Sequence, residues 1–179
     1  MKKTIIALVA ILAGLTSTAQ KGSKYLVGSV SYQKQTDADA TYGISPLVGY
    51  YVTDKSSVGM FGSVGTDGVT KSSSIGVFGR TDFLHIGKNC SVFAQASVGR
   101  STNKTSIDKY SEFEAKLGLG ANYSLSSKWG LTMHLCDIVR YENTNNAPTG
   151  NGGQSTFTLG LGAITNPFAV SNFGIVYKF

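Results

Sequence analysis

The stretch that decides the fold is the C-terminal heptapeptide Phe173-Gly174-Ile175-Val176-Tyr177-Lys178-Phe179. Every second residue is large and apolar or aromatic, and smaller or more polar residues stand between them. Because a β-strand turns alternate side chains to opposite faces, this segment forms a strand with one apolar, aromatic-edged face. The closing strand of a membrane barrel meets lipid with such a face, so the ending predicts a β-barrel in a membrane.

The chain before this ending supplies seven further candidate strands. Alternation is clearest at residues 110–124, where apolar side chains from Phe113 to Tyr123 share one face and Glu112, Glu114 and Lys116 share the other. A helix would scatter those charges around its circumference. The predicted strands cover residues 24–32, 41–52, 57–65, 73–84, 90–100, 110–124, 129–141 and 156–179. They predict an all-β, eight-stranded antiparallel transmembrane β-barrel with up-and-down meander order, a closed form without sheet edges in lipid.

The last predicted strand is too long for one membrane strand of about 9–11 residues. Pro167 stands inside it and cannot donate a hydrogen bond to a ladder. We expect an extension beyond the membrane, then a bulge, then the membrane strand. The alternative is a separate extra strand, which would break the even strand number.

The connections between predicted strands alternate in length. The short ones, at residues 53–56, 85–89 and 125–128, are expected at the periplasmic end. The long ones, at residues 33–40, 66–72, 101–109 and 142–155, are expected to form external loops.

With Phe173, Ile175, Tyr177 and Phe179 in its closing strand, the sequence resembles the OmpA/OmpX-type family of small outer-membrane β-barrels. The resemblance implies that this ending is an assembly signal, read by the barrel-insertion machinery. It also implies a Gram-negative bacterium and a place in its outer membrane.

The N-terminus has the order of a secretory signal peptide. Lys2 and Lys3 precede an apolar run at residues 5–15, and the small residues 17–19 form a cleavage site. We therefore expect a signal peptide at residues 1–19 and a barrel domain at residues 20–179. No later run of 18 or more apolar residues predicts a transmembrane helix.

Charged residues also fall on the predicted inward face. They are Arg80, Asp82, Glu112, Glu114, Lys116, His134 and Arg140. Because an eight-stranded barrel is just wide enough for its side chains to fill, we expect these charges to form a salt-bridged plug. The alternative is a narrow ion path or gated pore.

Signals for chemistry are weak. His85 is expected in a turn, and His134 accompanies no recognisable serine motif. The two histidines and two cysteines lack metal-ligand spacing, so we expect no catalytic residue, metal site or cofactor. Cys90 and Cys136 are predicted on opposite faces, which excludes a disulfide between them.

Both predicted rims carry aromatic residues, and one carries an excess of lysine. Aromatic bands are expected from Trp129, Tyr123, Tyr177 and Phe179 at the periplasmic end and from Tyr32, Tyr42, Tyr110 and Tyr141 at the external end. A periplasmic basic rim is expected from Lys55, Lys88, Lys128 and Lys178. Such a rim attracts anionic lipid head groups, although lysines also simply keep turns soluble.

These features predict a structural or surface-interaction role for an integral outer-membrane barrel. The expected partners are outer-membrane lipid, the barrel-insertion machinery during assembly and an extracellular partner of the loops, with no nucleic acid. The alternatives are a small porin-like channel, a soluble secreted lipocalin-like binder, and a barrel enzyme acting on lipid.

Overall fold

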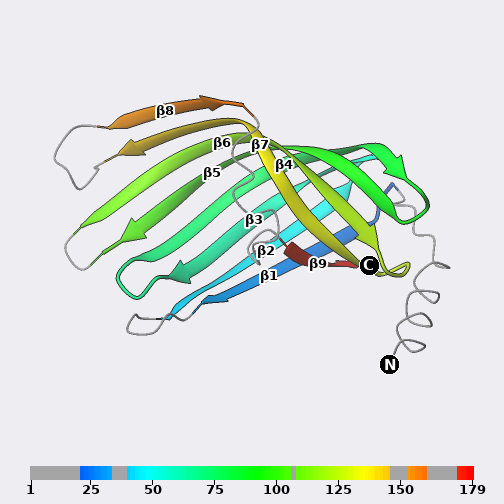
Figure 1. Ribbon diagram of the computed structural model, residues 1–179, viewed down its shortest axis with the longest axis horizontal. Coiled ribbons are helices and arrows are strands. Elements are labelled where there is room, and N and C mark those ends of the chain that lie inside the picture. The colour runs from blue at the N-terminus through cyan, green and yellow to red at the C-terminus, as the bar shows by residue number, and fades with distance from the viewer. Residues whose placement is uncertain (1–20, 34–39, 106–107, 146–152, 161–172) are drawn as a thin grey trace.

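The computed structural model describes residues 21–33, 40–105, 108–145, 153–160 and 173–179, so the predicted signal peptide lies outside the described residues. Nine strands occupy the described chain (Figure 1). They are β1 (Lys24–Gln33), β2 (Thr41–Tyr51), β3 (Ser56–Thr66), β4 (Lys71–Ile86), β5 (Cys90–Lys104), β6 (Lys109–Ser124), β7 (Trp129–Asn145), β8 (Gln154–Leu159) and β9 (Phe173–Lys178). In this part of the chain, no helix is long and apolar enough to cross a bilayer.

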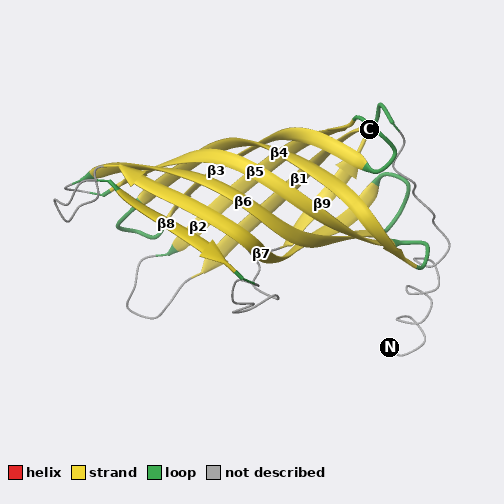
Figure 2. Cartoon of the chain, turned by 90° about the horizontal axis from the view of Figure 1, so that it is seen from above, coloured by secondary structure: helices red, strands yellow, loops and turns green. Residues whose placement is uncertain are grey.

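Strands β1 to β7 form a meander in which each strand pairs antiparallel with the next. Strand β9 pairs antiparallel with both β7 and β1, which closes the ring (Figure 2). Closure gives the strands at the two ends of the meander a hydrogen-bonding neighbour, as lipid surroundings require. The predicted eight-stranded meander barrel is thereby confirmed.

The eighth position of the barrel is shared by two strands. Strand β8 pairs with Val139–Thr144 of β7, and β9 pairs with Trp129–Met133 of the same strand. The expected extension at the start of residues 156–179 is a separate strand, as in the alternative, because β8 ends at Leu159 and β9 begins at Phe173. The even strand number survives, since β8 and β9 lie one beyond the other along β7.

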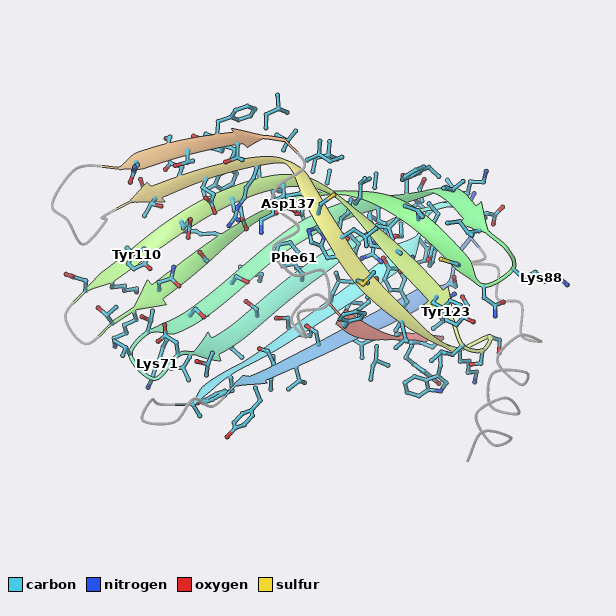
Figure 3. The ribbon with its side chains drawn as sticks, viewed as in Figure 1. Phe61, Lys71, Lys88, Tyr110, Tyr123 and Asp137 are labelled. Atoms are coloured by element: carbon cyan, nitrogen blue, oxygen red, sulfur yellow. The ribbon has the colours of Figure 1, made fainter. Side chains whose placement is uncertain are left out.

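The two ends of the barrel are distinguished by the C-terminus. We call the end that holds Phe179 and the turns at residues 52–55, 87–89 and 125–128 the C-terminal rim, and the other end the opposite rim. Backbone bonds tie the first rim together, from Phe179 N–H to the Lys24 carbonyl at 2.9 Å and from Lys178 N–H to the Lys128 carbonyl at 2.7 Å. Figure 3 shows Lys88 and Tyr123 at this rim.

Two of the expected long loops are only four residues long. Strands β3 and β4 stay paired up to Thr66 and Lys71, and β5 and β6 up to Lys104 and Lys109. Only residues 67–70 and 105–108 remain between them. The prediction of long loops at residues 66–72 and 101–109 is therefore wrong, because the polar segments continue the ladders instead of leaving them. The central parts of the other two expected loops lie outside the described residues.

The two faces of the barrel differ in polarity. Large apolar side chains stay exposed on the outer surface, among them Met60 at 56%, Ile75 at 62% and Ile175 at 57%. The buried apolar cluster lies inside the barrel. Its members are Tyr25, Val27, Tyr51, Phe78 and Val176, with Leu47 and Phe61 packed against them. The outer surface therefore carries large apolar side chains at a density that suits contact with lipid rather than water.

Candidate functional site in the barrel lumen

A buried arginine lies at the centre of the lumen. Strand β4 turns Arg80 inward, where the residue is only 7% exposed. Its guanidinium carbon lies 3.9 Å from the centroid of the Phe93 ring, 5.7 Å from that of Phe78 and 5.9 Å from that of Tyr25. These distances suit cation–π attraction, which is strengthened where water is excluded.

Arg80 also has a polar partner in the same layer. Its Nε and Nη2 both donate to Oε1 of Gln95, at 3.0 and 2.8 Å. We call Arg80, Gln95 and the three rings of Tyr25, Phe78 and Phe93 the Arg80 layer. Arg80 lines both the cavity beside the C-terminal rim and the cavity on the other side of the layer, so the layer stands between these two cavities.

Four rings of the lumen each pack over a glycine of the neighbouring strand. Tyr25 is the ladder partner of Gly49, Phe78 of Gly59, Phe61 of Gly76 and Phe93 of Gly120. A Cβ atom built on any of these glycines would overlap the facing ring. Sequence reasoning missed this layer, although its signal was present as inward aromatics opposite inward glycines.

A cavity of about 450 Å³ lies between the Arg80 layer and the C-terminal rim. Asp82, His85 and Lys178 line it, and Asp82 is only 7% exposed. His85 was expected in a turn, but it belongs to β4 because the strand runs on to Ile86. A register shift between Asp82 and Leu84 accompanies this extension.

A second cavity, of about 480 Å³, lies on the other side of the layer. Along its β6 and β7 wall, Glu114 accepts Lys116 Nζ at 2.7 Å and Arg140 Nε at 2.9 Å. Arg140 also pairs with Glu142, a residue that sequence reasoning assigned to a loop. Exposed fractions of 25–41% for these side chains show a network open to water on one wall.

The seven predicted lumen charges thus fall into separate groups. Glu114, Lys116 and Arg140 come together, and Glu112 stands on the same inward face of β6. Arg80 and Asp82 lie deeper, nearer the C-terminal rim. A strand separates these groups because β4 and β6 both pair with β5 and not with each other.

His134 belongs to an ion pair that only a bulge can form. Its Nε2 lies 2.9 Å from Asp137 Oδ1, although residues three apart point to opposite faces in a regular strand. The ladder of β7 against β6 skips Leu135, which returns Asp137 to the lumen side. Gly118 leaves room for this pair, since a Cβ atom there would lie 2.7 Å from His134 Cε1.

Both cysteines are free thiols, as expected. The reason given by the sequence is wrong, however, because the bulges in β7 pair Cys136 with the outward-facing Leu119. Cys90 pairs with Tyr123, four residues further along β6. The two cysteines are therefore kept apart by an intervening strand and by their different heights in the barrel.

The C-terminal residues that were predicted to form the assembly signal lead into the C-terminal rim. The closing strand alternates exposed Phe173 and Ile175 with buried Gly174 and Val176. The Tyr177 ring lies 4.8 Å from Trp129 and 6.1 Å from Phe179, between ring centroids. An aromatic cluster thus stands at this rim.

The predicted basic rim and the aromatic band predicted at the external end each contain one residue that does not lie on the outer surface. Lys55, Lys88 and Lys128 are exposed in turns, whereas Lys178 is half-buried beside the cavity of the C-terminal rim. At the opposite rim Tyr32 and Tyr42 are exposed ladder partners. Tyr110 lines the lumen instead, because it lies in the register of Glu112.

A closed antiparallel ring and an apolar outer face define a transmembrane-type β-barrel of eight strands. No family model matches the chain, and no curated protein sequence matches it. Among solved structures, the N-terminal β-barrel domain of Pseudomonas aeruginosa OprF is similar, with a TM-score of 0.51 and 15% identity. The match covers 89% of this chain and 98% of that domain.

Two further barrels resemble the chain more weakly. The outer membrane protein OprG from Pseudomonas aeruginosa gives a TM-score of 0.48 at 14% identity, covering 90% of this chain and 98% of that one. Ail, the attachment invasion locus protein of Yersinia pestis, gives 0.40 at 13% identity, covering 89% and 100%. The likeness to the OprF domain confirms the fold of a small closed β-barrel.

Proposed function

We propose that this protein is an integral barrel of a bacterial outer membrane with a structural or surface-interaction role, and that its lumen is closed to ions. The exposed apolar outer face supports the placement in a membrane. On β6 the outward apolar positions run from Phe113 to Tyr123. At about 3.3 Å per residue and a strand tilt near 40°, this run fits an apolar band roughly 25 Å tall.

The single observation that carries the closed lumen is the Arg80 layer. A buried guanidinium is packed by three rings and bonded to Gln95 at one level of the barrel. The rings in turn pack into places that only glycine leaves open. The closing element is thus aromatic and centred on one cation, and differs from the salt-bridged plug that the sequence predicted.

A small porin-like channel is the second candidate. The two cavities on either side of the Arg80 layer favour it, because only that layer would have to move for a path to form. The half-exposed pair of Glu114 and Lys116 would then line the path on one side.

Ion conductance in a planar bilayer separates the two candidates. We expect the wild-type barrel to insert without steady current and the double variant R80A/F93A to conduct, since it removes the cation and its nearest ring. The control is E114Q, which alters the water-exposed wall without touching the layer and should stay silent. A steady, voltage-proportional current through the wild-type protein would establish the channel and overturn the closed lumen.

We propose no catalytic role, since His134 accompanies no recognisable serine motif and its Nε2 is paired with Asp137. The partners that we propose are membrane lipid, the barrel-insertion machinery and a partner met at the external end. The aromatic alternation of β9 supports the second of these, because it presents Phe173, Ile175 and Phe179 outward.

A further inference from the structure

The outer face near the opposite rim carries a row of lysines. Lys71 on β4 is the ladder partner of Lys104 on β5, and Lys104 is the ladder partner of Lys109 on β6. Ladder partners point to the same face and lie about 4.5–5.5 Å apart between Cα atoms. Like charges so placed repel each other unless an anion lies between them.

The row faces outward and not into the lumen. The neighbouring row of Ser72, Asn103 and Tyr110 lines the lumen at this level, so the residues beside it point the other way. All three lysines are exposed, and Figure 3 shows Lys71 at this end of the barrel. The row therefore stands on the surface that surrounds the external end.

At this end of the barrel, basic side chains face outward and carboxylates face inward. A count of charges along the sequence does not show this separation. On β4, β5 and β6 the outward positions of this half hold Lys71, Arg100, Lys104 and Lys109 and no carboxylate, while Glu112 and Glu114 point inward. None of the ion pairs among the described residues includes these four cations.

Two aspartates lie in the adjacent turns without pairing with this row. Asp67 accepts the N–H groups of Val69 and Thr70, at 3.0 and 2.6 Å. Asp108 bonds with Thr105 through its main chain. Neither aspartate belongs to an ion pair among the described residues, so the basic row keeps its charge.

The basic row stands directly above the lipid-facing band. Arg100 pairs with Ile75 and Phe113, the last apolar level, and the lysine row follows four residues further out, roughly 13 Å along the strand. Hydroxyls fill the level between, from Ser73, Thr102 and Ser111. Below Arg100 lies an apolar groove of about 450 Å³, lined among others by Val77, Ala96, Val98 and Ala115.

We propose that this surface binds a phosphate-bearing lipid of the outward-facing leaflet. Its phosphates would lie against Arg100 and the row Lys71–Lys104–Lys109, with hydroxyl donors between, and an acyl chain would lie in the groove below. The inference rests on the membrane placement proposed above. The occupant is a lipid and not a free anion, because the cations continue into an apolar groove that a soluble anion would leave empty.

The test uses fluorescence quenching by lipids with brominated acyl chains. The chain has one tryptophan, Trp129, at the C-terminal rim, so the variant F113W/W129F moves the reporter beside Arg100. The protein is refolded into phosphatidylcholine vesicles holding a minor share of brominated phosphatidylglycerol or, for reference, brominated phosphatidylcholine. Each basic side chain near an anionic surface changes lipid preference by roughly fivefold, so we expect the relocated tryptophan to report at least a threefold preference for phosphatidylglycerol.

The variant K71Q/K104Q/K109Q in this background should bring the preference close to one. The matched control K55Q/K88Q/K128Q removes the same charge from the C-terminal rim and should leave it unchanged. The site would be overturned if both lysine variants lost the phosphatidylglycerol preference equally. It would also be overturned if the F113W/W129F protein showed no such preference. The measurement is repeated in inorganic phosphate and in chloride of the same ionic strength. If phosphate alone abolishes the phosphatidylglycerol preference, the lysine row binds free anions and the lipid site is overturned. If brominated phosphatidylcholine does not quench the relocated tryptophan at all, the membrane placement fails as well.

Discussion

Phe93 on β5 fills the space above Gly120, its ladder partner on β6, and a Cβ atom at Gly120 would overlap the ring. The same ring lies 3.9 Å from the guanidinium of Arg80, between ring centroid and Cζ. The position of the central cation therefore depends on the absence of a side chain one strand away.

This relationship predicts that Gly120→Ala destabilises the barrel. The added methyl must displace Phe93 from a packed layer, and overpacking of this kind costs about 1–3 kcal/mol. The measurement is the urea midpoint of unfolding in vesicles. The control is Gly79→Ala, where a Cβ atom meets nothing within 4 Å. Equal urea midpoints for the two variants would mean that Phe93 can move aside without loss of stability.

The charged wall gives a second prediction, on Glu114. Glu114→Ala leaves Lys116 and Arg140 without their shared carboxylate. Because these side chains are 28–41% exposed, we expect a loss of about 1 kcal/mol and not the 3–5 kcal/mol of a fully buried pair. The turn variant Asp108→Ala, compared by urea unfolding, should lose less. If the two variants unfold at the same urea concentration, the ion pairs of Glu114 contribute nothing to stability.

A third prediction concerns assembly. Removal of Phe179 takes away a ring that stacks on Tyr177 at 6.1 Å and the N–H group that bonds the Lys24 carbonyl. We expect export to continue and the amount of folded, heat-modifiable barrel in the outer membrane to fall. Phe157→Ala, which removes an exposed ring from β8 far from the C-terminus, is the control. Normal barrel levels after loss of Phe179 would exclude the ending as an assembly signal.

The basic rim gives a fourth prediction. Lys55, Lys88 and Lys128 are exposed in the turns of the C-terminal rim, which the sequence predicts at the periplasmic end. Anionic lipid should raise the thermal stability of the wild-type barrel more than that of K55Q/K88Q/K128Q, by about 1 kcal/mol per lysine at low salt. Thermal unfolding with and without anionic lipid, at low and high salt, measures the difference. Equal stabilisation of both proteins would leave these lysines as solvated turn residues.

A fifth prediction concerns pH at the turn of residues 67–70. The N–H groups of Thr70 and Val69 donate to the Asp67 carboxylate, and these bonds hold its pKa below the ordinary value. A lowered pKa contributes stability that is present above the ordinary pKa and is lost as the pH falls through the folded pKa. NMR titration should show the Asp67 carboxyl ionising below the ordinary pKa of an aspartate, with faster exchange of the Thr70 amide at the acid end. An Asp67 carboxyl that titrates at the ordinary aspartate pKa would contradict the turn geometry.

The number and order of the membrane strands could be read from the sequence because the alternation of side chains has a direct physical meaning. A residue pattern such as that from Phe113 to Tyr123 can satisfy lipid on one side and the lumen on the other only as a strand. The outward position of Phe173 and Ile175 follows from the same rule, and the structure places both there.

Strand ends were predicted less well, since polar residues around Lys71 and Lys104 suit a loop and a ladder equally. Their pairing depends on the neighbouring strand, which supplies backbone partners that the local sequence does not record.

What the sequence by itself determined is the fold class, the face of each regular strand and the closing strand, because these follow from a period of two. What only the tertiary structure decided is which side chains meet. Bulges at Leu135 and Ile138 shift the period within β7, so Asp137 reaches His134 and Cys136 turns outward. Ladder register joins Lys71, Lys104 and Lys109 and sets Phe93 over Gly120, because contacts between strands depend on alignment across the sheet and not on spacing along the chain.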